Sequence, residues 1–184
     1  MKGINSFLVA PYNGRRYDNI EKIGGVDVVT GTSEEDHKVA NRFAEVIETP
    51  IDYTGDIKKG DILIVHHNIF KIYNDTGGKR RSMATHFRDM LFFITPDLFY
   101  LYTNDGTWKC HDRYCFVKPI KAPHMVTEYV PLTGEMKYVN STLSNYGVKQ
   151  GDTVIFSPDA EYEFKIDGEL LYRVFDHMIT GVIK

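Results

Sequence analysis

The chain has 184 residues and a formal net charge of −3, and 42% of its residues are hydrophobic and 13% aromatic. These proportions are typical of a folded globular protein, and the absence of a basic excess argues against a dedicated nucleic-acid binder. The two cysteines, Cys110 and Cys115, do not make a disulfide framework. No apolar run is long enough to span a bilayer and the first residues carry no signal-peptide pattern, so we expect a cytoplasmic protein.

Strand patterns separated by turn residues dominate the chain and indicate small antiparallel barrels. In the first half we expect strands at residues 7–11, 43–47, 61–65, 69–73, 90–94 and 97–102. In the second half we expect them at residues 114–119, 135–139, 153–156, 162–166, 170–174 and 178–183. A weak 3.6-residue periodicity over residues 34–43 is the only hint of a helix.

The first two expected strands are joined by a long connection, residues 12–42. Within it, Val26, Val28 and Val29 lie between the glycine pair at residues 24–25 and an acidic run that ends at Asp36. Connections of this length inside a compact domain are usually functional or disordered. Two interpretations stay open: a flexible loop that folds onto a partner's groove, or one more barrel strand over residues 25–30.

The chain also repeats one pattern. Residues 56–65, DIKKGDILIV, reappear as residues 147–156, GVKQGDTVIF, and each run passes through a Gly-Asp turn into an apolar strand. Residues 90–99 match residues 170–179 in the same way. A repeat of this kind predicts two related β-domains, each too small to bury a large share of its surface alone.

We place the two domains at residues 1–104 and 105–184, because Asn104-Asp105-Gly106 is a turn signal between the copies. The fold prediction is therefore all-β, with two tandem small barrels. The copies differ most where residues 12–42 of the first are replaced by only 120–134 in the second, and the first also has the longer excursion 74–88.

These residues resemble the GroES-type co-chaperonins, which close the folding chamber of a chaperonin. Gly24-Gly25-Val26-Asp27-Val28-Val29-Thr30-Gly31 resembles the family's mobile loop. Residues 148–156, VKQGDTVIF, resemble its most recognisable strand, and residues 169–179 resemble its closing run. Read twice, the resemblance covers nearly the whole chain and implies two GroES-like barrels.

The family's mobile loop implies a non-enzymatic lid that binds a GroEL-type chaperonin and encloses folding substrate proteins. The residues carried over as chaperonin-binding are Gly24, Gly25, Val26, Val28, Val29 and Thr30. The resemblance implies no cofactor or metal, and a ring of seven chains that supplies seven loops to a sevenfold chaperonin.

Three departures from the family stand out. Asp27 interrupts the aliphatic patch, the second copy has no Gly-Gly-aliphatic loop, and the segments that correspond to the family's roof, residues 49–55 and 140–146, are short. Short roofs resemble phage-encoded co-chaperonins, which would place the protein in the cytoplasm of a bacterial host.

Two other functions remain open. A duplicated barrel also suits a phage virion or assembly protein, and Lys79, Arg80 and Arg81 on the excursion suit a small-barrel nucleic-acid binder. Cys110, His111 and Cys115 lack the spacing of a zinc site. His66 and His67 are expected on opposite faces of a strand, and no catalytic motif is present.

Overall fold

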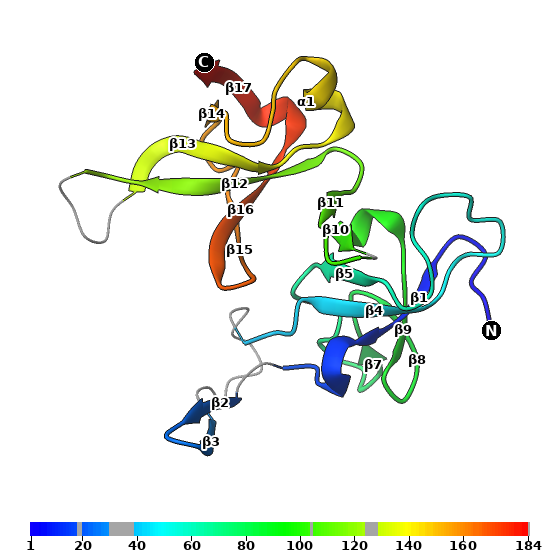
Figure 1. The fold of residues 1–184 in the computed structure, drawn as a ribbon. Coiled ribbons are helices and arrows are strands. Elements are labelled where there is room, and N and C mark those ends of the chain that lie inside the picture. The colour runs from blue at the N-terminus through cyan, green and yellow to red at the C-terminus, as the bar shows by residue number, and fades with distance from the viewer. Residues whose placement is uncertain (18–19, 30–38, 104, 124–128, 184) are drawn as a thin grey trace. The chain divides into compact units, whose positions relative to one another are not determined.

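The computed structural model describes residues 1–17, 20–29, 39–103, 105–123 and 129–183 (Figure 1). The chain divides into two compact units, Met1–Gly106 and Thr107–Lys184. Nearly all of their regular secondary-structure elements are β-strands, so the all-β prediction is confirmed. Among the described residues, no helix is both long and apolar enough to cross a membrane.

The first unit contains ten strands in the described residues: β1 (Phe7–Pro11), β2 (Ile20–Ile23), β3 (Val26–Val29), β4 (Phe43–Glu48), β5 (Ile62–Val65), β6 (Tyr73–Asn74), β7 (Arg80–Arg81), β8 (Thr85–Arg88), β9 (Leu91–Ile94) and β10 (Phe99–Thr103). The second unit contains β11 (Lys109–Cys110), β12 (Tyr114–Lys121), β13 (Tyr129–Tyr138), the short helix α1 (Ser141–Asn145), β14 (Thr153–Phe156), β15 (Tyr162–Ile166), β16 (Glu169–Phe175) and β17 (Ile179–Ile183). Short 3₁₀ helices occupy Tyr12–Gly14, Pro96–Leu98 and Asp176–Met178.

The two units share one sheet topology. Antiparallel neighbours follow the order β10-β5-β4-β1-β9-β8 in the first unit and β17-β14-β13-β12-β16-β15 in the second. The registers correspond as well, since Val9 pairs with Val46 and its counterpart Val117 pairs with Met136, each just after a register shift. The repeat in the sequence is thus also a repeat in the structure.

Closure of either sheet into a barrel, expected from the sequence, is not seen in the strand pairing. The strand orders are linear, and no pairing between described residues joins the strands β10 and β8 or the strands β17 and β15. Each unit is an open antiparallel sheet.

The Gly-Asp turn of the first unit connects β4 to the start of β5. Gly60, at φ 89°, donates its N–H to the carbonyl of Val46 at 2.7 Å, and Val46 donates back to the carbonyl of Asp61 at 2.9 Å. The Asp61 carboxylate accepts the N–H of Lys58 at 2.7 Å. A residue without a Cβ is needed at position 60, because L side chains rarely adopt this φ.

The second unit repeats this turn bond for bond. Gly151, at φ 90°, donates to the carbonyl of Met136 at 2.8 Å, and Met136 donates to the carbonyl of Asp152 at 2.8 Å. The Asp152 carboxylate accepts the N–H of Lys149 at 2.9 Å. The Gly-Asp pair that marks the repeat in the sequence therefore has the same structural role in both units.

Each unit has its own hydrophobic core, built from equivalent strand positions. Side-chain size at three equivalent positions changes in compensating directions: Phe7 becomes Cys115, Val46 becomes Met136, and Val65 becomes Phe156. A loss of volume at one position is offset by gains at the other two, which is how a core keeps its packing density while its sequence diverges.

The expected strand over residues 69–73 is wrong. Ile69 and Phe70 lie in a turn after β5, held by the Ile69 N–H to the His66 carbonyl at 3.1 Å, and only Tyr73 begins a strand. Ile69 and Phe70 are both fully buried. Successive strand residues point to opposite faces, so a turn is needed to bring both adjacent side chains into one core.

The expectation that His66 and His67 point apart is also wrong. Strand β5 ends at Val65, and in the turn that follows, the two imidazole rings stack with centroids 4.2 Å apart.

The weak helical periodicity over 34–43 lies mostly outside the described residues, and Phe43 begins strand β4. Strand β13 begins at Tyr129, well before the expected residue 135.

Candidate functional site

The glycine-flanked segment in the long connection of the first unit folds as a separate hairpin. Strand β2 pairs with β3 in the register Ile23 to Val26 and Ile20 to Val29, which leaves Gly24 and Gly25 as the two-residue turn. Their φ angles are 60° and 85°. Two positive φ angles are the signature of a type I′ turn, whose twist matches that of the strands it joins.

Two of the predicted contact residues are exposed on this hairpin. Val26 is 65% exposed and Val28 is 38% exposed. Because side chains alternate along a strand, residues 26 and 28 lie on the same face of β3. The hairpin therefore presents two neighbouring aliphatic side chains that the core of the unit does not absorb.

The other predicted contact residues are less defined. Val29 is the last residue of β3, opposite Ile20, and Thr30 lies outside the described residues. Residues 26–29 do form a strand, as one interpretation expected, but its described pairing is with β2 in a separate two-stranded sheet and not with the main sheet. The other interpretation, a loop that folds onto a partner's groove, stays a prediction.

The connection is clamped at its base by Asn41, which sequence reasoning missed. The Asn41 amide nitrogen donates to the carbonyls of Tyr12 at 2.9 Å and Arg15 at 2.7 Å, and its amide oxygen accepts the N–H of Phe43 at 2.9 Å. Its backbone N–H donates to the Arg16 carbonyl at 3.0 Å.

Only 4% of Asn41 is exposed, so these bonds are shielded from water and an unmade bond would be costly. Next to this clamp, Tyr17 and Ala40 form an antiparallel bridge that brings the two ends of the connection together. The clamp holds the two ends of the long connection together at the main sheet. A polar residue just before an apolar strand was the only sequence signal for it.

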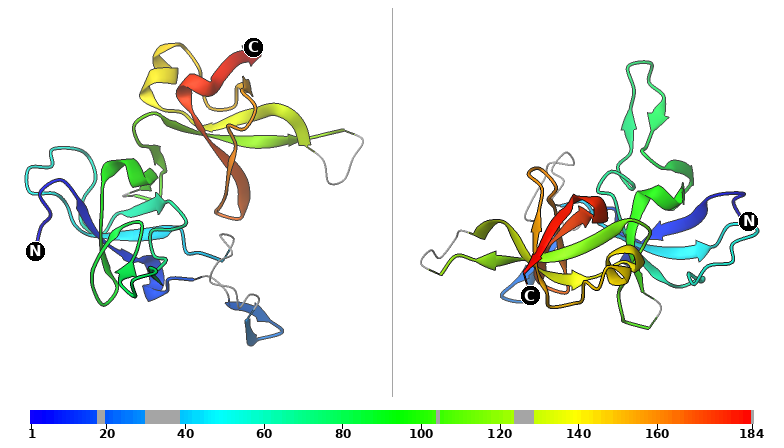
Figure 2. Two further views of the ribbon diagram at one scale, coloured as in Figure 1. Left: turned by 180° about the vertical axis from the view of Figure 1, so that it is seen from behind. Right: turned by 90° about the horizontal axis from the view of Figure 1, so that it is seen from above.

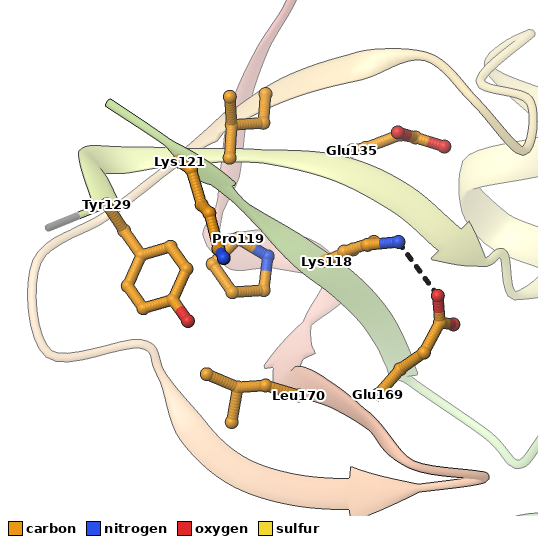
Figure 3. Close-up of a pocket in the computed structure, with 8 residues that line it drawn as sticks. Lys118, Pro119, Lys121, Tyr129, Glu135, Glu169 and Leu170 are labelled. Atoms are coloured by element: carbon orange, nitrogen blue, oxygen red, sulfur yellow. Dashed lines mark hydrogen bonds and ion pairs between the residues drawn. The ribbon is translucent and has the colours of Figure 1, made fainter. Parts of the chain in front are cut away.

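The second unit holds a pocket of about 360 Å³ between β12, β13 and β16 (Figure 3). At its edge the Glu169 carboxylate accepts hydrogen bonds from the ammonium groups of Lys118 at 2.8 Å and Lys137 at 2.6 Å. These two bonds, of which the one from Lys118 has the larger effect, lower the pKa of Glu169 to about 2. A carboxylate with so low a pKa is a poor proton donor near neutral pH. The two hydrogen bonds link strands β12, β13 and β16.

The cysteines do not form a metal site with the residues around them. No group of three or more His, Cys, Asp or Glu side chains suited to a metal occurs in the described part of the chain. Burial raises the pKa of the Cys115 thiol to about 12 and raises that of Cys110 well above its usual value. Both thiols stay protonated at neutral pH and are weak ligands and nucleophiles.

The chain matches no protein-family model, and no curated protein matches it.

Proposed function

We propose that this protein is a co-chaperonin of the GroES type, a lid that caps a GroEL-type chaperonin and encloses folding substrate. The observation that carries the proposal is the β2–β3 hairpin, which exposes Val26 and Val28 on one face and belongs to the connection whose ends Asn41 holds together. Among the described residues the hairpin occurs in only the first of two units that share one strand order, so the shared fold does not require it. A partner surface is the simplest reason to keep it.

The binding energy of one hairpin would be small. The exposed parts of Val26 and Val28 together amount to about one valine side chain, worth about 2 kcal/mol on complete burial. That is less than the roughly 4 kcal/mol of a millimolar complex. A single hairpin would therefore bind weakly and dissociate quickly, which suits a lid that must open.

Tight but reversible capping then requires several hairpins on one assembly. A ring of hairpins that meets a ring of sites gains affinity through effective concentration without any new contact. We propose a ring of seven chains, in which the first unit docks through its hairpin and the second enlarges the enclosed chamber. The second unit brings no Gly-Gly-aliphatic segment, so seven chains supply seven hairpins to seven sites.

The test is to measure, by co-sedimentation, the binding of this protein to a GroEL-type chaperonin with and without ATP. Val28→Asp places a charge on the docking face, and we expect it to abolish binding while the oligomer stays intact. The matched control is Ile155→Asp in β14, because Ile155 is also 38% exposed but lies in the other unit. Normal binding by the Val28→Asp protein would refute the proposed role of the hairpin.

A further inference from the structure

We infer that the excursion between β5 and β8 is a second binding element, an arm for single-stranded nucleic acid, independent of the valine hairpin. Residues 66–84 join β5 to β8 in the first unit, whereas residues 157–161 suffice between the equivalent strands β14 and β15. The shared fold therefore does not need the extra length. Insertions of this kind on a conserved scaffold are common sites of function.

The arm has a charge opposite to that of the protein. Residues 66–84 contain four basic residues and one acidic residue, a formal +3 in a chain whose total is −3. The basic residues are Lys71, Lys79, Arg80 and Arg81. A local excess of this size attracts polyanions even when the whole protein is acidic.

The arm is a hairpin held by specific hydrogen bonds. Strands β6 and β7 form a hairpin, drawn in green, that extends from the sheet of its own unit (Figure 2). One Asp75 carboxylate oxygen accepts the N–H groups of Gly77 and Lys79, each at 2.9 Å, and the other accepts Arg81 Nε at 2.9 Å. These bonds, of which the one from the Lys79 N–H has the largest effect, lower the pKa of Asp75, so its carboxylate stays charged at neutral pH. Ser82 fastens the base through its hydroxyl, which donates to the Ile69 carbonyl at 2.9 Å.

Exposed aromatic rings accompany the charges. Tyr73 is 53% exposed and is the register partner of Arg81, so the two side chains share one face of the hairpin. Next to the arm, on β8, Phe87 is 41% exposed, although its ring also contacts Phe93, with centroids 5.8 Å apart, and the Arg88 guanidinium, 5.2 Å from its centroid. Cations hold a phosphate backbone, and open aromatic faces stack unpaired bases. An acidic protein surface would use the cations but would leave the rings without a role, and a duplex would hide its bases.

The experiment is fluorescence anisotropy with a labelled 12-nucleotide single strand of mixed sequence, as DNA and as RNA, at 50 and 200 mM salt. With phosphate contacts from Lys71, Lys79 and the neighbouring Arg88, the logarithmic salt slope should be about −2, a loss of roughly 20-fold in affinity between the two salt concentrations. Tyr73→Ala should weaken binding by at least about fivefold without changing the slope. Tyr73→Phe should restore binding, because it keeps the ring.

Lys79→Gln should reduce the slope by about 0.7, whereas the control Lys149→Gln, an exposed lysine of the second unit, should leave both affinity and slope unchanged. No binding at 50 mM salt would overturn the inference. A Tyr73→Ala protein that binds the strand as tightly as the unchanged chain would also overturn it. If polyglutamate then displaces the strand from both proteins equally well, the arm would be assigned to an acidic polypeptide. Val28→Asp should not affect this assay, so its result is separate from that of the chaperonin test.

Discussion

The turn of the β2–β3 hairpin gives a quantitative test of how its binding face is formed. Gly25 has a φ of 85°, and a Cβ added there would meet no atom within 4 Å. An alanine at this position therefore suffers only backbone strain, roughly 1–2 kcal/mol. Its restriction of the unfolded chain offsets about 0.4–1 kcal/mol of this cost. The net cost to the hairpin of Gly25→Ala is about 1 kcal/mol, or roughly a fivefold loss of population.

A fivefold loss should be easy to detect, because an isolated two-stranded hairpin is at best marginally stable in water. We would measure backbone chemical shifts and cross-strand NOEs over residues 20–29 by NMR, and chaperonin affinity in parallel. We expect Gly25→Ala to move the shifts toward random-coil values and to weaken capping.

The matched control is Gly24→Asn. Asparagine tolerates positive φ, and Asn-Gly is a favoured type I′ pair, so the hairpin should be retained. Unchanged hairpin signals in the Gly25→Ala protein, or equal damage from Gly24→Asn, would refute the argument that the turn requires left-handed backbone at these positions.

Three further predictions concern the scaffold. Asn41→Ala removes a buried amide with three side-chain hydrogen bonds and should lower the free energy of unfolding by about 3 kcal/mol in urea titrations; a loss below 1 kcal/mol would mean that the clamp is unimportant. Asp61→Ala should destabilise more than Asp152→Ala in the same titration, since Asp61 is only 6% exposed and Asp152 is more exposed; the reverse order would contradict the burial argument. The pKa of Glu169 is lowered from its usual 4.5 to about 2, so the stability that this carboxylate contributes is present above pH 4.5 and is lost as the pH falls toward 2. Glu169→Gln should flatten the plot of unfolding free energy against pH in that window. An unchanged plot would mean that the bonds from Lys118 and Lys137 do not cause the pH dependence.

Much of the fold was predictable because it depends on local patterns. The apolar run of Phe7 to Pro11 and the segment Thr153 to Phe156 correspond to strands with the expected bounds. The Gly-Asp repeat marked two turns that prove identical in their hydrogen bonds. Both signals lie within a few consecutive residues.

What the sequence did not show depends on distant partners. Ile69 and Phe70 have a strand-like pattern but are drawn into a turn by a core that needs both side chains. Asn41 becomes a clamp only because Tyr12 and Arg15, far along the chain, leave their carbonyls nearby.

The candidate site was predicted in part. The glycines marked the turn of the hairpin, and the valines marked its apolar content. That Val26 and Val28 share one face follows only from the pairing of β3 with β2. The basic residues of the arm were visible in the sequence, but the three hydrogen bonds to Asp75 that shape the arm were not.

The central claim is that seven chains form a ring that caps a chaperonin through one valine hairpin each. Native mass spectrometry tests it most directly, on the purified protein alone and then with a GroEL-type chaperonin and nucleotide. We predict a heptamer that joins the chaperonin only when nucleotide is present. A monomer, or an oligomer of another size that ignores the chaperonin, would contradict the claim and favour a structural or assembly role for the duplicated β-fold.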